Sequence, residues 1–496
     1  MTRVRLLFFL ITFVIAAAWD ASAQCTAKPT AKMQSVGASS ALTGLDNPTS
    51  FSIADRGAIT PLDTSGSAGS VTTGYARVQA NTGSTTPSGF LIFSYTRNGV
   101  LVSEATVPEM RPISSGRIYA SVDGAVNTGV AIVNPNSTAV TVSFYLTDAS
   151  GQNFGGGNFS LPANSQIAHF LNEAPFNETG TINGTFTFSS TAPVGVIALR
   201  GFTNERGEFL MTTLPVADLS ASASSDVVFF PHYASGGGWT TQVVLVNTTD
   251  GAISGTVQFL GSGGSSSPYS IAARSMQRIV ATSSGSTTAS GGIRVTPDMG
   301  TASPSGLSIF SFKNAGVTVS EAGVPTLRSG AAFRMFEIDC GSYPGQLQTG
   351  LAIANPSATN TATVTLELTT LTGAPTGMTS TLSIPPSGQT AAFMKQFPGF
   401  EGIPYPFHGV VRISTTSAEG VAVVGLRGEY NERKDFLVTT STPTDEAAPV
   451  SSAEALFPHL ADGGGYKTEF VLFSGSSGQS STGMLRFFTQ SGAPLN

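Results

Sequence analysis

The sequence predicts an all-β protein, built as a tandem array of β-sandwich modules of about 100 residues each. Three observations support this fold class. The chain repeats over a long period, apolar and polar residues alternate along short segments, and Gly-, Ser-, Asn- and Pro-rich turns separate those segments at about ten-residue intervals. No stretch has the periodicity of an amphipathic helix. Each copy is therefore expected to fold as two facing sheets.

The long repeat is clearest at LRGFTNERGEFLMTT, residues 199–213, which returns as LRGEYNERKDFLVTT at residues 426–440. A match of this density does not arise from composition alone. Four other pairs have nearly the same offset: FSIADR 51–56 with YSIAAR 269–274, SGFLIFSYTRNGVLVSEATVP 88–108 with SGLSIFSFKNAGVTVSEAGVP 305–325, TGVAIVNP 128–135 with TGLAIANP 349–356, and FFPHYASGGGWTT 229–241 with LFPHLADGGGYKT 456–468. The repeat therefore covers most of the chain.

The alternation is clearest in residues 362–368, where Val364, Leu366 and Leu368 occupy every second position and Thr or Glu the positions between. A period of two over this length predicts a strand with one buried face. The same pattern recurs in the other copies: Val140, Val142, Phe144 and Leu146; Val257 and Phe259; Leu485 and Phe487.

The repeats divide the chain into modules, with a polar segment at 24–50 before them. We expect a partial module at 51–110, complete modules at 111–216, 226–326 and 330–443, and a partial module at 453–496. The first partial module lacks the opening strands and the last lacks the closing ones. Either the last module is cut short, or the two terminal halves pair into one sandwich and close the array. The distance between the N-terminal and C-terminal strands distinguishes these alternatives.

Residues 1–23 have the features of a secretory signal peptide. Arg3 and Arg5 precede an apolar stretch at 6–18, and Ala21-Ser22-Ala23 forms an A-x-A cleavage site. The apolar stretch is too short to favour a membrane span, and no later segment qualifies as one. We therefore expect an exported protein, extracellular or at the cell surface, without a transmembrane segment.

Composition narrows the partners. Charged residues make up 11% of the chain and the formal net charge is −6, whereas soluble domains average about 25% charged residues. A basic surface for nucleic acid is absent, as are Lys/Arg clusters for anionic lipid. Nucleic acid is therefore not an expected partner.

The NER motif, at residues 204–206 and 431–433, is a first candidate site. Asn followed by charged residues is typical of a hairpin tip, where Arg200 or Arg427 could pair with Glu on the same face. The functional alternative makes Glu205 and Glu432 ligand contacts. A turn that recurs with its module is explained more simply as a turn.

The FPH…GGG(W/Y) element is the second candidate. It places His232 and Trp239 in one copy and His459 and Tyr466 in the other. A His and an aromatic ring beside flexible glycines could hydrogen-bond and stack on a sugar. The alternative is a His bonded to a neighbouring loop, an aromatic ring that fills the end of the sandwich, and a tight glycine turn. No cluster has the spacing of metal ligands, and no cofactor is expected.

Catalytic motifs are scarce. The four histidines, at 169, 232, 408 and 459, belong to no recognisable catalytic spacing, and no nucleophile elbow, phosphate-binding loop or zinc-protease signature occurs. The two cysteines, Cys25 and Cys340, could form one disulfide in an oxidising compartment or remain unpaired.

The TGLAIANP strand, the LRGxxNERxxFLxTT hairpin and the FPHxAxGGG(W/Y)xT element together resemble those of uncharacterised secreted repeat proteins of environmental bacteria. This resemblance implies location and architecture, not an activity. More distantly, module size and strand rhythm resemble immunoglobulin-like and fibronectin type III-like domains. The two core cysteines around a Trp that mark antibody domains are missing.

From these features we expect a non-enzymatic secreted or cell-surface repeat protein with a structural or adhesion role. Extracellular polysaccharide, matrix or a cell-surface protein is the expected partner. The alternative is a carbohydrate-binding array that uses the Trp239 and Tyr466 loops. A secreted hydrolase is the third hypothesis, and it requires His and carboxylates to converge in one cleft.

Overall fold

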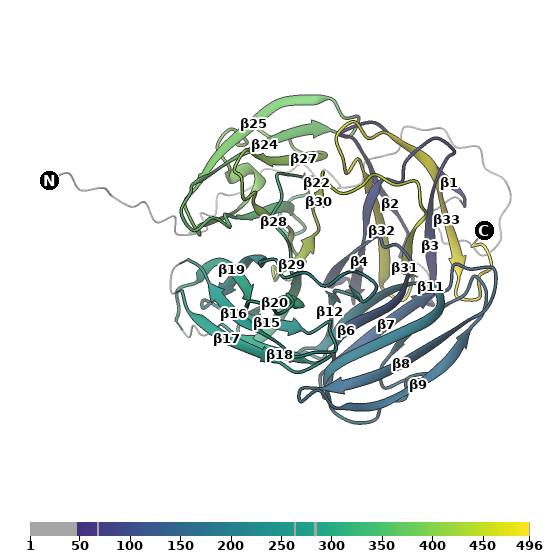
Figure 1. The fold of residues 1–496 in the computed structure, drawn as a ribbon. Coiled ribbons are helices and arrows are strands. Elements are labelled where there is room, and N and C mark those ends of the chain that lie inside the picture. The colour runs from purple at the N-terminus through teal and green to yellow at the C-terminus, as the bar shows by residue number, and fades with distance from the viewer. Residues whose placement is uncertain (1–46, 67–68, 262–263, 282–284, 496) are drawn as a thin grey trace.

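A computed structural model describes residues 47–66, 69–261, 264–281 and 285–495. It confirms the all-β fold: the described residues form 33 strands and one short 3-10 helix, η1 (Met394–Gln396). The strands group into four units of eight or nine strands around a common centre (Figure 1). In each unit, the strands form two facing sheets.

Module 3 shows the plan of one unit. One sheet has the strand order β14-β19-β16-β17, and the other has the order β18-β15-β20-β21, with all pairs antiparallel. The strands are β14 (Val228–Ser235), β15 (Trp239–Val246), β16 (Ile253–Phe259), β17 (Ser266–Ile271), β18 (Met276–Val280), β19 (Ala289–Pro297), β20 (Ser305–Asn314) and β21 (Val317–Pro325).

Module 2 follows the same order, except that one long strand, β11, takes part in both sheets. Its first part pairs with β6 and β8, and its second part pairs with β7 and β12, with a register shift between Ser189 and Val194. The strands are β6 (Ile113–Asp123), β7 (Val126–Val133), β8 (Val140–Asp148), β9 (Asn153–Leu161), β10 (Gln166–Phe170), β11 (Ile182–Thr203), β12 (Phe209–Leu214) and the short β13 (Ala217–Asp218).

Module 4 repeats this plan as β22-β27-β24-β25 and β26-β23-β28-β29. A short contact between β22 and β23 joins its two sheets. The strands are β22 (Ala332–Cys340), β23 (Leu347–Ala354), β24 (Ala362–Thr370), β25 (Pro375–Ile384), β26 (Gln389–Phe393), β27 (Phe407–Thr415), β28 (Ala422–Tyr430), β29 (Phe436–Ser441) and the short β30 (Thr444–Asp445).

The fourth unit is assembled from both ends of the described chain, and we call it the split module. Its sheets, β1-β33-β3-β31 and β2-β32-β4-β5, have the strand order of module 3 with the chain interrupted between the third and fourth strands. The terminal segments therefore pair, as the closure hypothesis predicts. The strands are β1 (Thr49–Ile53), β2 (Ala58–Asp63), β3 (Thr72–Ala80), β4 (Ser88–Arg97), β5 (Val100–Pro108), β31 (Ala455–Asp462), β32 (Tyr466–Phe473) and β33 (Ser481–Thr489).

The four cores contain the alternating apolar residues that the sequence pattern identified. Val364, Leu366 and Leu368 are buried in module 4, and Leu485 and Phe487 in the split module. The cores also extend between modules, because apolar clusters join module 2 to module 3, module 3 to module 4, and the split module to both of its neighbours. The units therefore form a closed ring instead of an extended array.

At the ring centre, the edge strands β5, β12, β21 and β29 lie against one another. Two repeated motifs, SEA (103–105 and 320–322) and TT (212–213 and 439–440), supply hydroxyl groups that bond backbone edges across the modules. Ser103 Oγ accepts the Met211 N–H at 2.8 Å, and in the other half of the ring Ser320 Oγ accepts the Val438 N–H at 2.8 Å. These bonds satisfy sheet edges that would otherwise lie buried and unpaired.

Candidate functional site

The NER hairpins form tight turns that reach into the neighbouring module. Asn204 Oδ1 accepts the backbone N–H groups of Arg206 and Glu208, and its Nδ2 donates to the Thr318 carbonyl at 2.9 Å. Asn431 repeats this arrangement, with its Nδ2 donating to the Leu101 carbonyl at 2.8 Å. The buried asparagine therefore shapes the hairpin and joins it to the next module.

The two NER glutamates have the same structural role. Glu205 accepts the Thr318 N–H at 2.7 Å and pairs with Lys313 at 2.7 Å, and Glu432 accepts the Leu101 N–H at 2.8 Å. Burial alone would raise the pKa of Glu205, but the bonds from Lys313 and the Thr318 N–H outweigh it and lower this pKa to about 2. Both glutamates thus bind backbone of the same chain.

The arginines of the LRG motif do not pair within their own hairpin, contrary to the sequence expectation. Arg200 pairs with Glu321 of module 3 at 3.2 Å, and Arg427 pairs with Glu104 of the split module at 3.1 Å. All four side chains are largely buried. The sheet face that carries each arginine packs against the next module, and the acidic partner comes from that module. The geometry of the hairpin alone therefore could not identify this partner.

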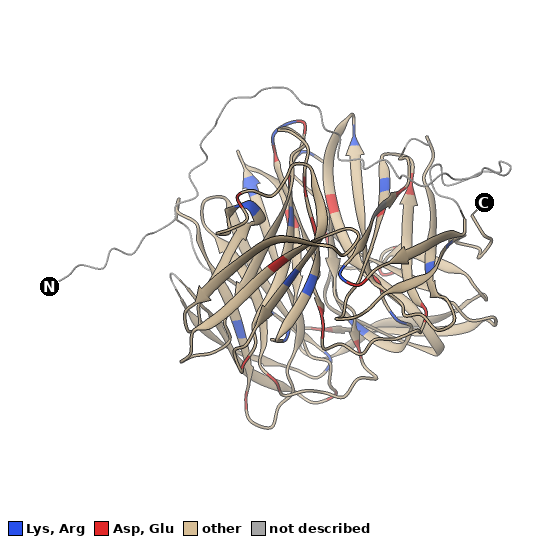
Figure 2. Ribbon diagram, turned by 90° about the horizontal axis from the view of Figure 1, so that it is seen from above, with Lys and Arg blue, Asp and Glu red and all other residues tan. Residues whose placement is uncertain are grey.

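The two hairpins also contact each other across the ring centre in a reciprocal manner. Arg206 pairs with Asp435 at 2.7 Å, and Arg433 pairs with Glu208 at 2.5 Å. These partners are equivalent positions of the two copies, so the ring has an approximate two-fold relation about this point. Charged positions are sparse on the ribbon, and acidic and basic ones lie side by side at several loop tips (Figure 2).

The FPH histidines lie at module boundaries. His232 Nδ1 lies 3.1 Å from Gln389 Nε2 of module 4, and His459 Nδ1 lies 3.1 Å from Gln166 Nε2 of module 2. An amide N–H2 group can only donate, so each ring nitrogen accepts and the imidazole is neutral. Burial agrees, since it lowers the pKa of both histidines to about 4. This geometry is the one in which the His bonds a neighbouring module.

The glycines and the threonine of the same element form its turn. Gly236, Gly237 and Gly238 all have positive φ, between 61° and 94°, and the second copy repeats these values at 463–465. Only glycine adopts three such conformations in succession without strain. The buried Thr241 then bonds the Ala234 N–H and carbonyl across the hairpin. The backbone conformation of the turn therefore explains why the motif contains three glycines.

Trp239 and Tyr466 are half-buried and stack on aromatic residues of the adjacent strand. The Trp239 ring lies 4.8 Å from Phe312, and the Tyr466 ring lies 4.6 Å from Tyr95. Both pairs lie at the end of the sheet that carries the β20–β21 and β4–β5 turns. His232 and Trp239 each have their ring centre 5.9 Å from that of Phe310, and both Trp239 and Tyr466 retain some exposure.

Module 4 has exposed aromatic side chains that its partner copy lacks. Tyr343 and Tyr405 are 50% and 43% exposed. Tyr343 packs edge-on against Tyr430 at 5.1 Å, with the Lys434 ammonium 5.5 Å from its ring, and Tyr430 continues to Phe436 at 5.1 Å. Sequence comparison of the copies could have found this cluster, because Tyr343 lies in a loop unlike its counterpart in module 2.

A buried carboxylate pair is also specific to module 4. Glu337 and Asp339 are 0% and 3% exposed, where the equivalent residues of module 2 are Ala120 and Val122. Burial raises the pKa of Glu337 to about 8, which favours its neutral form. Asp339 pairs with Lys395 at 3.3 Å, which opposes the burial that raises the Asp339 pKa.

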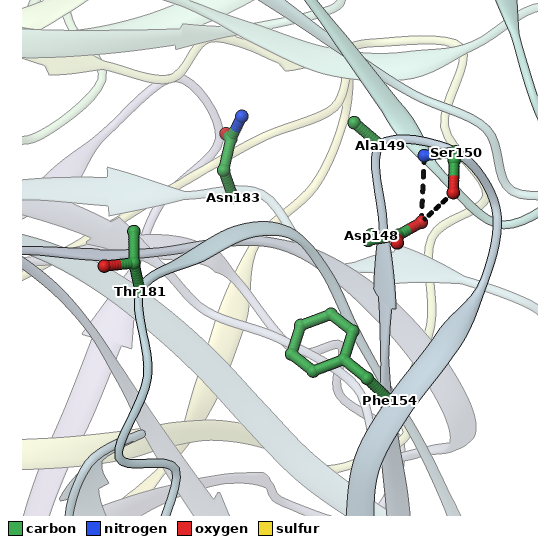
Figure 3. Close-up of a pocket in the computed structure, with 6 residues that line it drawn as sticks. All are labelled: Asp148, Ala149, Ser150, Phe154, Thr181 and Asn183. Carbon is green, nitrogen blue, oxygen red and sulfur yellow. Dashed lines mark hydrogen bonds between the residues drawn. The ribbon is translucent and has the colours of Figure 1, made fainter.

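A surface hollow of about 520 Å³ lies on module 2 (Figure 3). Its wall includes Asp148, which accepts the Ser150 N–H at 2.9 Å and the Ser150 hydroxyl at 2.7 Å, and these bonds lower the Asp148 pKa. Ala149, Phe154, Thr181 and Asn183 form the rest. The carboxylate is committed to its own turn, so the hollow offers one aromatic ring and two small polar side chains.

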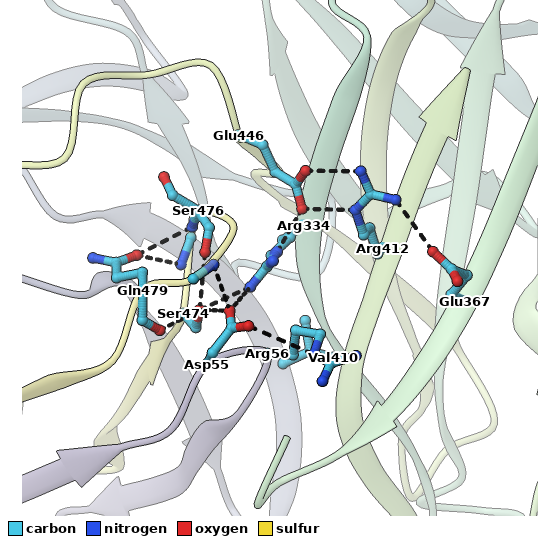
Figure 4. A network of polar contacts seen from close by, with 12 residues as sticks. Asp55, Arg56, Arg334, Glu367, Val410, Arg412, Glu446, Ser474, Ser476 and Gln479 are labelled. Carbon is cyan, nitrogen blue, oxygen red and sulfur yellow. Dashed lines mark hydrogen bonds and ion pairs between the residues drawn. The ribbon is translucent and has the colours of Figure 1, made fainter. Parts of the chain in front are cut away.

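A second cavity, of about 90 Å³, adjoins a polar network where module 4 meets the split module (Figure 4). The buried Arg334 donates to Glu446 at 2.6 Å, to Asp55 at 2.9 Å and to Ser474 at 2.8 Å. Arg412 adds a bidentate pair with Glu446, at 2.9 and 3.0 Å. Acids and bases balance here, which leaves no net charge for an ionic ligand.

The equivalent joint between modules 2 and 3 uses neutral partners. Arg117 donates to the Thr187 hydroxyl at 2.9 Å, to the Asn247 carbonyl at 2.8 Å and to the Tyr145 hydroxyl at 3.4 Å. The same joint can therefore form around Arg117 without the cluster of charges that surrounds Arg334.

Cys340 is buried and disulfide-bonded. Cys25, its partner in the sequence hypothesis, lies outside the described residues, as do the predicted signal peptide and the polar segment up to residue 46. Among the described residues, no group of three or more His, Cys, Asp or Glu side chains is placed to hold a metal ion. None of the helices in the described ranges has the length and apolar character needed to span a bilayer.

No family model matches the chain, and no curated protein matches it. Among solved structures, an archaeal virus protein described as a triple jelly roll and turret assembly is 12% identical, with 79% of this chain and 91% of that chain covered and a TM-score of 0.14. The VP2 subviral particle of infectious bursal disease virus is 8% identical, with coverages of 89% and 80% and a TM-score of 0.12. Scores this low carry no argument about fold or function.

Proposed function

We propose that this protein is a non-enzymatic secreted or cell-surface protein with a structural or adhesion role. The carrying observation is that the repeated motifs serve as joints of a closed ring. Asn204, Glu205 and Arg206 and their copies bind the neighbouring modules, as do His232 and His459. Such residues build a scaffold that holds loops and side chains of other positions in fixed places.

The test is binding of the purified mature protein to immobilised cell surfaces, matrix proteins and extracellular polysaccharides. The expected result is saturable binding to at least one of them, without hydrolysis of the material that is bound. Absence of binding to every surface contradicts adhesion, and turnover of a substrate contradicts the non-enzymatic part.

Carbohydrate binding is the second candidate, and the exposed aromatic side chains favour it. Tyr343 at 50% exposure and the half-buried Trp239 present ring edges and faces of the kind on which sugars stack. Of the two tryptophans, Trp19 lies in the proposed signal peptide, so Trp239 is the single fluorophore of its kind in a chain cleaved after Ala23. Glycan binding at its loop is expected to change Trp239 emission, and Trp239→Phe is the matched variant. Unchanged emission with a bound glycan excludes this loop and directs attention to Tyr343.

We also propose, from sequence features alone, that the protein is exported and that it is related to other secreted repeat proteins. The signal peptide supports an extracellular location, and N-terminal sequencing of secreted protein would test cleavage after Ala23. The motifs support membership in a group of secreted repeat proteins, and the module size supports a likeness to immunoglobulin-like or fibronectin type III-like domains.

A further inference from the structure

The split module is built by alternation of its two chain segments. In one sheet the order β1-β33-β3-β31 takes strands in turn from residues 49–80 and 455–489, and in the other β32 lies between β2 and β4. Five strand pairings cross between the segments, and only β4–β5 joins neighbours within one segment. Neither segment can form its sheets alone.

The side-chain contacts of this module also cross between the segments. Phe457, Phe470 and Phe487 of the C-terminal segment pack in the same core as Phe51 and Phe93 of the N-terminal segment. At the surface, Arg77 forms a bidentate pair with Glu454, at 2.8 and 2.7 Å, and Lys467 pairs with Asp63 at 2.6 Å. The described structure therefore joins the segments by strand pairing, core packing and ion pairs.

The connection to the C-terminal segment is suited to movement. Residues 447–450, between β30 and β31, are exposed and include Pro449. Two backbone bonds of this stretch are local: the Ala447 N–H donates to the Asp445 side chain, and the Ala448 N–H donates to the Asp445 carbonyl. This linker can adopt another path without breaking a strand pairing.

We propose that the split module is an exchange joint, in which the C-terminal segment (residues 454–495) of one copy completes the split module of a second copy. The partner is a second copy of this chain because an identical segment offers the same register, core side chains and ion pairs. Exchange of identical elements is a known low-cost route to oligomers. Within one chain the segment competes at an effective concentration in the millimolar range, so closed monomers dominate at micromolar protein.

Two single-cysteine variants test this exchange. Gln79 and Met484 are direct neighbours on β3 and β33 and lie on the outer face of the sheet, at a Cα separation that a disulfide can bridge. Gln79→Cys and Met484→Cys chains are unfolded together, refolded at about 10 μM and at about 1 mM, and then oxidised. Peptide mapping counts the disulfides between positions 79 and 484.

The expected result is an interchain 79–484 disulfide whose yield rises with the concentration during refolding, in a dimer with the near-UV circular dichroism of the monomer. Two controls set its scale. The chain with both substitutions should form the disulfide within a monomer at 10 μM, which shows that the geometry is right. Gln79→Cys mixed with Thr141→Cys, an exposed position on β8, gives the collisional background. A 79–484 yield at or below that background at 1 mM overturns the proposal.

Discussion

Replacing Arg334 by Met tests whether the charged network holds the ring closed. The guanidinium donates to Asp55, which follows β1, to Ser474, which follows β32, and to Glu446 of module 4. One side chain thus bonds both segments of the split module. It is buried, with only 2% of the side chain exposed.

The magnitude follows from what the substitution leaves behind. Breaking a buried ion pair by removal of one partner costs about 3–5 kcal/mol, because the other charge stays buried and uncompensated. Glu446 keeps its bidentate bond to Arg412, and Asp55 is 35% exposed and keeps a contact to Arg56 at 3.6 Å. Both remaining charges are partly compensated, so we expect a loss near the lower end, about 3 kcal/mol.

Arg117→Met is the matched control. This arginine has the same position in module 2 and bonds Thr187, Tyr145 and the Asn247 carbonyl, and burial lowers its pKa. Its removal leaves no uncompensated charge. We expect a loss of about 1–2 kcal/mol, because neutral hydrogen-bond acceptors lose a donor but no buried charge is left uncompensated.

The assay is urea denaturation of the full chain at neutral pH, followed by far-UV circular dichroism, with proteolysis of the chain ends as a local readout. Arg334→Met should lower the unfolding midpoint more than Arg117→Met, and it should speed cleavage within 447–450. Equal shifts for the two variants would refute the view that the charged network, instead of burial alone, secures the closing joint.

Three further predictions concern other joints. The folded-state pKa of Glu337, about 8, exceeds the unfolded value near 4.5, so its contribution to folding stability is complete below pH 4.5 and is lost as pH rises through 8. Glu337→Gln should therefore flatten the decline of the urea midpoint with rising pH. An unchanged pH dependence of the midpoint contradicts this prediction. The His232 pKa of about 4 lies below the unfolded value near 6.5, so folding stability is lost as pH falls from 6.5 to 4. His232→Gln should reduce this loss of stability in acid. An equal loss in the variant would mean that other groups cause it. Arg433→Ala should cost at most about 1 kcal/mol, because its side chain is 36% exposed; a larger loss would mean that the reciprocal pairs at the centre act as a cooperative unit.

Local features of the fold could be predicted from the sequence because strands and turns have local causes. The alternation at Val364–Leu368 required one buried face, and the three glycines before Trp239 required a turn that only glycine permits. The partner of Arg200 could not be predicted in this way, since Glu321 lies in another module and meets it only when the ring closes. A signal was present: a charged residue recurs in the apolar strands of both copies, in LRG and in SEA, and buried charges need partners.

The two halves of the ring act as controls for each other. Where both copies keep a residue and a contact, as with the Asn204 and Asn431 bonds to the next module, the contact explains the residue. Where only one copy has a feature, and that feature makes no bond to a neighbouring module, ring assembly does not explain it. Module 4 has three such features: exposed Tyr343, exposed Tyr405, and the buried acid Glu337 where module 2 has Ala120. Since the ring needs none of these to form the equivalent joint on its other side, ligand contacts that distinguish the halves should be sought first on module 4.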